Sequence, residues 1–111
     1  MIVSNESNTV VGCLDIYDYD AINERASLGI LIDKAYRQKG FAKATIALCV
    51  EYLFQNLMLH QVHCCIDELN EESQQLFTNQ DFVLCGRRKG WIKTSEGFID
   101  ELEYQRINDN P

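Results

Sequence analysis

The stretch "LGILIDKAYRQKGFAKATIALCVEYLF", residues 28–54, decides how this chain folds. It starts as an apolar run, passes through a short basic loop around Gly40, and continues with apolar residues at helical spacing. This order predicts a strand, a loop and an amphipathic helix. The strand, residues 26–33, is apolar at nearly every position, which indicates that both of its faces are covered. Gly29 within it suggests a β-bulge.

The long helix should run from Gly40 to about Leu59, because no glycine or proline interrupts it. Its apolar face is predicted to consist of Phe41, Ala44, Leu48, Val50, Leu53, Phe54 and Leu57. A second helix is expected over residues 70–80, where Asn70 is the N-cap and two glutamates follow in the first turn.

Strands are expected on both sides of these helices, because β-branched and aromatic residues gather there between polar turns. The predicted ranges are residues 9–20, 61–67, 82–94 and 97–107. The resulting order is β-β-α-β-α-β-β. The two strands bridged by the long helix should pair in parallel, with antiparallel strands around them, which is an α+β fold class.

Composition limits the size and the partners of the chain. At 111 residues and 46% hydrophobic, residues 1–111 should form one domain with one core. The net charge of -7 argues against a nucleic-acid partner, because such partners need clustered cations. An acidic surface favours a cationic small molecule or basic peptide, and it also occurs in many proteins for solubility alone. We expect no membrane contact and a cytoplasmic location, because neither a spanning segment nor an export signal is seen.

Five cysteines form an odd set without a C-x-x-C motif, which predicts reduced thiols. The segment "HQVHCC", residues 60–65, raises the possibility of a zinc site built on His60, His63 and Cys64. Adjacent residues of a strand point to opposite faces, so Cys64 and Cys65 cannot both serve one ion. We therefore expect no metal.

The basic loop has the features of an anion site. A helix that opens near Gly40 presents free backbone N–H groups, and its dipole favours negative charge. Arg37, Lys39 and Lys43 add full positive charges in an otherwise acidic chain. The alternative is a solvated basic helix start. Neither the P-loop pattern nor the dinucleotide-binding glycine pattern is present.

The segment "RQKGFA", residues 37–42, resembles the pyrophosphate loop of the GNAT superfamily of N-acetyltransferases, whose pattern is Arg/Gln-x-x-Gly-x-Gly/Ala. The strand "ASLGILID" is similar to the family strand that splays from its neighbour, and "LHQVHCCIDELNEESQQLFTNQDF" is similar to the strand and helix that follow. The likeness extends from about Thr9 to Tyr104. It is greatest to spermidine/spermine N-acetyltransferases and to ribosomal-protein N-acetyltransferases.

The resemblance implies a GNAT-type mixed, mostly antiparallel central sheet with flanking helices, and acetyl-coenzyme A as co-substrate. The splayed strand would bind the pantetheine arm through its backbone, the loop would bind the pyrophosphate, and the next strand and helix would contact the arm. Asn70 would combine this contact with its role as a cap. The implied coenzyme-binding residues are Ile30, Leu31, Ile32, Arg37, Gln38, Lys39, Gly40, Phe41, Ala42, Lys43, Asn70, Ser73 and Phe77.

The proton-transfer positions depart from the family pattern. Polyamine acetyltransferases carry a tyrosine, the proposed general acid, where this chain has Phe77, and many relatives carry a glutamate where it has Ser27. We expect water, or Ser73 with water, to protonate the leaving thiolate. Asp81 replaces the glycine of the usual Gly-Phe pair, which is tolerable because Asp accepts left-handed conformations better than most residues.

The chain also begins almost at the second family strand, so the usual first strand and two helices, which form one wall of the acceptor site, are expected to be missing. An apolar sheet face left uncovered would favour a homodimer. Acids on the first hairpin, Asp15, Asp18, Asp20 and Glu24, either attract a polyamine or form its solvated face. For Trp91 and Phe98 we expect one of two places, either the lining of the acceptor channel or the core.

The sequence thus predicts an N-acetyltransferase that transfers an acetyl group from acetyl-coenzyme A to a primary amine, either a polyamine or a protein N-terminus. The alternative is a coenzyme-binding or dimerisation module without turnover, suggested by Phe77, Ser27 and the missing wall.

Overall fold

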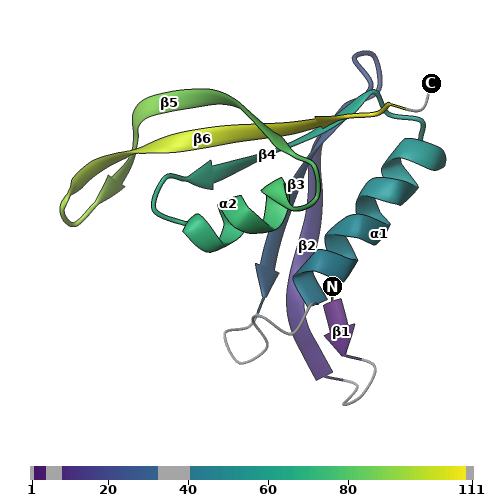
Figure 1. Ribbon diagram of the computed structural model, residues 1–111, viewed down its shortest axis with the longest axis horizontal. Helices are drawn as coiled ribbons and strands as arrows, with labels where there is room; N and C mark the ends of the chain where they lie inside the picture. The colour runs from purple at the N-terminus through teal and green to yellow at the C-terminus, as the bar shows by residue number, and fades with distance from the viewer. Residues whose placement is uncertain (1, 5–8, 33–40, 110–111) are drawn as a thin grey trace.

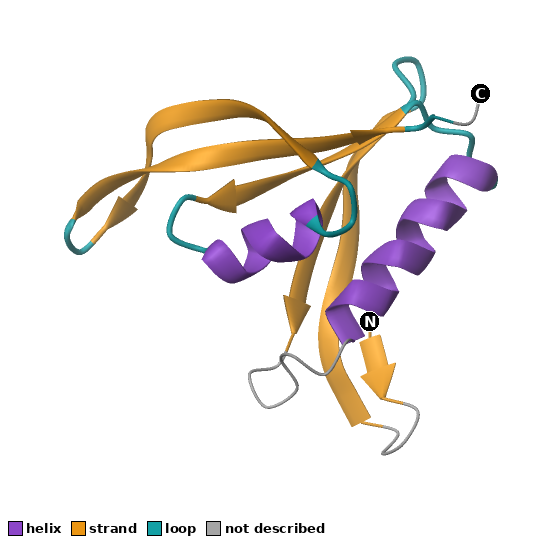
Figure 2. Ribbon diagram, in the orientation of Figure 1, coloured by secondary structure: helices purple, strands orange, loops and turns teal. Residues whose placement is uncertain are grey.

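The structure is a computed structural model and describes residues 2–4, 9–32 and 41–109. The elements follow one another as strands and helices in the predicted order, with one additional short strand at the start (Figures 1 and 2). They are β1 (Ile2–Ser4), β2 (Thr9–Asp20), β3 (Arg25–Ile32), α1 (Phe41–Gln55), β4 (Gln61–Asp67), α2 (Glu71–Thr78), β5 (Val83–Thr94) and β6 (Gly97–Ile107).

The strands form one sheet in the order β1-β2-β3-β4-β6-β5. Only β3 and β4 pair in parallel among the described strands, and the other neighbours are antiparallel. Helix α1 makes the crossover between β3 and β4, as a parallel pair requires. The α+β class and the parallel pair predicted from the sequence are therefore confirmed.

Both helices pack on the same face of this sheet. Alternate residues of β4 are buried, and they form one core with the buried residues of α1 and α2. The opposite face, which we call the open face, carries Ser27, His63 and Glu103 from three neighbouring strands. The core residues are Ala26, Leu28, Ile46, Val50, Leu53, Leu59, Val62, Cys64, Ile66, Phe77, Phe82, Leu102 and Tyr104.

Helix α1 differs from its prediction in its end and in its buried face. Ile46, Val50 and Leu53 are buried, whereas Leu48 is 69% exposed. The sequence pattern did not resolve this face because α1 is apolar on several sides. The helix ends at Gln55, since Met58 adopts a left-handed conformation, with φ of 54°, and turns the chain toward β4.

Two further features of the strands differ from expectation. Gly29 is not in a bulge: it pairs with Asp15 in continuous register, and the irregularity between β2 and β3 falls between Tyr17 and Asp20. Strand β1, Ile2–Ser4, was not predicted and pairs antiparallel with β2.

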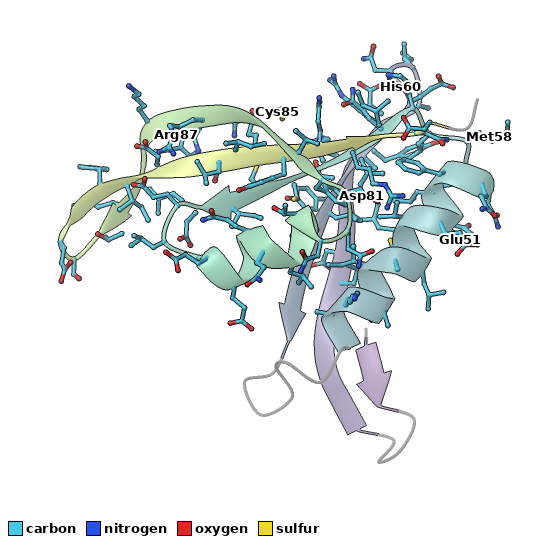
Figure 3. The ribbon with its side chains drawn as sticks, viewed as in Figure 1. Glu51, Met58, His60, Asp81, Cys85 and Arg87 are labelled. Carbon is cyan, nitrogen blue, oxygen red and sulfur yellow. The ribbon has the colours of Figure 1, made fainter. Side chains whose placement is uncertain are left out.

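Helix α2 is closed at both ends by identifiable hydrogen bonds. The Asn70 side chain accepts a hydrogen bond from Ser73 N at 3.1 Å, which confirms the predicted N-cap. At the other end, Asp81 N donates to Thr78 O and Phe82 N donates to Phe77 O, both at 3.1 Å. This is the Schellman pattern, and Asp81 occupies its left-handed position with φ of 67° (Figure 3). The sequence prediction for Asp81 is confirmed.

Candidate functional site

Strands β3 and β4 separate part-way along their length. Their parallel pairing consists of three residue pairs and ends at Ser27 opposite His63. Beyond this point β3 continues to Ile32 beside β2, while β4 continues to Asp67 beside β6. Figure 1 shows the two strands diverging like the arms of a V.

The inner edge of β3 is therefore available beyond Ser27. Leu28 to Ile32 are in register with residues of β2 on one side, and within the described residues no strand pairs with them on the other side. Every second N–H and C=O of a strand points to the same edge, so the V is lined by backbone groups that an extended ligand can pair with. Ile30, Leu31 and Ile32 belong to this edge.

Helix α1 starts close to the end of β3 in sequence, after the basic loop. The predicted residues Arg37, Gln38, Lys39 and Gly40 lie outside the described residues. The helix begins at Phe41, and Lys43 is an exposed cation in its first turn. No acidic residue occurs in this turn, so the free N–H groups and the helix dipole keep their positive potential.

Helix α2 follows the other arm of the V. Asn70 stands three residues after the end of β4, and Ser73 lies partly buried in the first turn of the helix. Phe77 lies one turn further on, is 3% exposed, and packs edge-on against Phe82 with ring centroids 5.1 Å apart. The structure thus places Asn70 and Ser73 near the end of β4 and Phe77 in the core. Their coenzyme contacts stay predictions.

The interaction between Ser27 and His63 was not predicted from the sequence. Ser27 is 2% exposed, and its hydroxyl oxygen lies 2.9 Å from Nε2 and 3.2 Å from Nδ1 of His63. Burial lowers the pKa of His63, and the positive charge of Arg25 lowers it further. The imidazole is therefore neutral at pH 7. Only the register of the parallel strands brings these two residues together, and a single sequence does not specify that register.

The open face is hollowed next to this pair, with a volume of about 840 Å³. Asp18, Asp20 and Glu103 line the hollow together with Arg25 and Arg88. Arg25 lies 3.5 Å from Asp20, and Arg88 lies 2.5 Å from Glu103, so both cations are paired. The lining of the hollow combines these charged side chains with apolar surface, including that of Tyr19 and Ile22. The homodimer predicted from an uncovered apolar sheet face stays a prediction.

The cysteines do not form a metal site within the described residues. Cys64 is buried and Cys65 is exposed, which confirms that they point to opposite faces. Burial raises the pKa of the Cys64 thiol to about 12, and it also raises the pKa of Cys65. Both are neutral thiols at pH 7. Among the described residues, no three histidine, cysteine or acidic side chains come together as ligands.

Strands β5 and β6 form a long hairpin that extends from the sheet (Figure 2). Trp91 is 61% and Phe98 is 67% exposed, so the core alternative for these two residues is wrong. The base of the hairpin is held by Arg87, whose guanidinium lies 2.7 Å from Asp100 and 3.1 Å from Glu68 (Figure 3). The hydrogen bond from Arg87 to the Asp100 carboxylate keeps the pKa of Asp100 below its usual range.

The parallel pair that opens into a V, followed by helices on one face, is the arrangement that the resemblance implied. A sequence profile described as "Acetyltransferase (GNAT) domain" matches residues 1–83. The chain belongs to this family of acetyltransferases, whose members in general use acetyl-coenzyme A.

Individual relatives agree with this assignment. The chain is 26% identical over 101 residues to an uncharacterized prophage-derived N-acetyltransferase of Bacillus subtilis, covering 91% of this chain and 57% of that protein. It is 24% identical over 82 residues to the spermidine N(1)-acetyltransferase of Vibrio cholerae, covering 74% of this chain and 47% of that protein. The chain thus spans about half the length of the curated relatives that it matches.

Solved structures show the same fold. A ribosomal-protein-S5-alanine acetyltransferase from Vibrio fischeri superposes with a TM-score of 0.89 at 19% identity, covering 97% of this chain and 60% of that one. A mutant spermidine N-acetyltransferase from Vibrio cholerae gives a TM-score of 0.88 at 20% identity, covering 96% and 63%. In the described part of this chain, neither helix is long and apolar enough to cross a membrane.

Proposed function

We propose that this chain transfers an acetyl group from acetyl-coenzyme A to a primary amine, in the cytoplasm. The observation that carries the proposal is the separation of β3 from β4 beyond Ser27 and His63, which leaves the inner edge of β3 free among the described strands. A pantetheine arm is an extended chain with amide groups, so it can pair with that edge as an added strand does.

The two ends of the coenzyme would then lie at different parts of the site. Its diphosphate would lie at the start of α1, where Lys43 and the helix N–H groups favour anions. Its thioester would lie inside the V, where an N–H of β3 at or beside Ile30 polarises the carbonyl. Asn70 and Ser73, at the start of α2, would contact the arm from the β4 side.

The acceptor is proposed to enter from the open face. Several spermidine N-acetyltransferases are among the relatives, and the hollow on that face contains the carboxylates of Asp18, Asp20 and Glu103. Asp20 and Glu103 are paired with arginines, and Asp18 is exposed, so Asp18 is the carboxylate best able to attract a cationic amine. A polyamine fits this charge, and a peptide N-terminus is the second candidate.

Release of free thiol tests the proposal. The chain is incubated with acetyl-coenzyme A and, in turn, spermidine, butylamine and an alanine-initiated peptide, and released coenzyme A is measured with a thiol reagent. Amine-dependent release supports acetyl transfer. Calorimetric binding of acetyl-coenzyme A without release by any amine supports the alternative of a coenzyme-binding module. Absence of both binding and release contradicts both.

Asp18→Asn separates the two acceptor classes. We expect a several-fold rise in KM for spermidine, which carries several positive charges, with little change in kcat, because an exposed carboxylate mainly raises the local concentration of cations. Glu51→Gln, at an exposed position on α1 away from the hollow, is the matched control for loss of one charge. The same measurement run with the peptide shows whether the effect depends on acceptor charge.

A further inference from the structure

The Ser27–His63 pair lies where the proposed reaction needs a proton acceptor. It is the last pair of the parallel register, so it marks the closed end of the V. Both side chains lie on the open face, away from the helices, because their strand neighbours Ala26, Val62 and Cys64 point into the core. The pair therefore borders both the V and the hollow.

Burial and charge keep the His63 ring available as a base. Four charged side chains act on it, Arg25 and Glu103 from the adjacent strands β3 and β6, and Asp18 and Arg88 from the next strands β2 and β5. Desolvation and the arginines lower the pKa of the ring, whereas the two carboxylates raise it, and the net direction is downward. The ring is consequently neutral at pH 7, and one of its nitrogens carries a lone pair.

We propose that His63, oriented by Ser27, accepts the proton that the amine loses as it attacks the acetyl thioester. This inference rests on the proposed acetyl transfer, and it assigns the general base, which the sequence did not identify. Many relatives carry a glutamate at the position of Ser27. In this chain the basic group comes instead from the partner strand, at the position directly opposite in the parallel register.

The proton transfer balances without a further reagent. The neutral amine nitrogen forms a bond to the acetyl carbon, becomes cationic, and is then far more acidic than a free alkylammonium. Its proton passes to His63 while the carbon–sulfur bond breaks and the thiolate leaves. The imidazolium afterwards returns its proton to solvent, and the thiolate is protonated by water. The products are the acetylated amine and coenzyme A.

The distance from His63 to the thioester requires a short chain of waters. Ile30 lies three residues beyond Ser27, about 10 Å along the strand at a rise of about 3.3 Å per residue. Both ring nitrogens of His63 lie within 3.2 Å of the Ser27 hydroxyl oxygen, so roughly two or three waters, at about 2.8 Å per hydrogen bond, span this distance. General bases also act through such water chains. Ser27 is a positioning residue here, since its hydroxyl acts through its hydrogen bond with His63.

The chain contains two histidines, which makes the test specific. Proton–carbon NMR spectra of the imidazole rings are recorded against pH, and His60→Gln identifies the remaining signal as that of His63. We expect this signal to titrate below pH 6.5. The kcat/KM of the wild-type chain should fall on the acid side with the same pKa, and this limb should stay in place when spermidine is exchanged for a peptide of lower amine pKa.

Substitution provides the second readout. His63→Gln should lower kcat by about 10²-fold or more and abolish the acid limb, with the Kd for acetyl-coenzyme A unchanged. His60→Gln, at an exposed position between α1 and β4, should behave as wild type. Ser27→Ala should move the NMR pKa of His63 and the acid limb by the same amount, which a merely structural role would not do.

The outcomes separate this inference from the proposed function. If the wild-type chain releases coenzyme A and the His63→Gln variant retains its activity within threefold, the role of His63 is overturned but the proposed function is not. If His63→Gln fails to fold, a mismatch between the wild-type acid limb and the NMR pKa of His63 overturns it. A wild-type chain that releases no coenzyme A with any amine overturns the proposed function and this inference with it.

Discussion

Asn70 offers a test that distinguishes a structural role from a coenzyme contact at one position. Its Oδ1 accepts the hydrogen bond from Ser73 N at 3.1 Å and caps α2. Asn70→Ala removes this bond, and loss of an N-cap costs about 1 kcal/mol. For a chain of 111 residues, a loss of about 1 kcal/mol lowers the Tm by about 4 °C.

Asn70→Ser keeps the cap, because a serine hydroxyl also accepts from an N–H of the first turn. Its stability should stay within about 0.5 kcal/mol of wild type. Serine lacks the amide group, however, so both variants lose the hydrogen bond predicted between Asn70 and the pantetheine arm. Loss of one such bond, about 1 kcal/mol, weakens the Kd for acetyl-coenzyme A by about fivefold.

The assays are thermal unfolding and titration calorimetry of the two variants. Asn79→Ala, at an exposed asparagine that follows the last turn of α2, is the control. An unchanged Kd in both Asn70 variants would show that Asn70 is a cap only. A serine variant as unstable as the alanine variant would refute the capping argument itself.

Three further predictions concern stability. Because the pKa of His63 is lowered in the folded chain, the unfolded chain binds more protons than the folded one just below pH 6.5. The free energy of unfolding, measured with urea, should therefore fall as the pH drops from about 6.5 toward the folded pKa. His63→Gln should flatten this pH dependence. Asp81 has φ of 67°, so Asp81→Ala should be less stable than Asp81→Gly by about 1 kcal/mol in the same assay, and equal stabilities would contradict the left-handed assignment. Leu53 is 0% exposed, so Leu53→Ala should cost about 2 to 5 kcal/mol, whereas Leu48→Ala, at a position 69% exposed, should stay within about 0.5 kcal/mol.

Local patterns were sufficient to predict most of the elements. The strand Gln61–Asp67 has the predicted bounds, and the cap at Asn70 follows from side-chain chemistry that acts over three residues. The left-handed Asp81 was predicted because the Gly-Phe pair of the resemblance identified the turn. In each case the determining interaction lies within a few residues of the chain.

Tertiary packing determines the features that the local sequence pattern did not predict. Helix α1 is apolar on several sides, and only its contacts with the sheet decide that Ile46 is buried while Leu48 is exposed. Strand β1 has three residues, too few for a periodic signal. Likewise, the hydrogen bond of Ser27 to His63 joins residues 36 positions apart, and its prediction requires the strand register.

Under the proposed function, that register accounts for a serine at the position where the resemblance implies a glutamate in many relatives. Ser27 is 2% exposed, so a carboxylate there would be buried against His63 and would raise the pKa of the ring by charge pairing. The small hydroxyl avoids this effect and leaves the ring neutral at pH 7. A parallel pair places two side chains side by side on the open face, and a proton acceptor on either strand borders the same opening. Under the proposed function, the basic residue can therefore lie on either strand while the geometry of the V is retained.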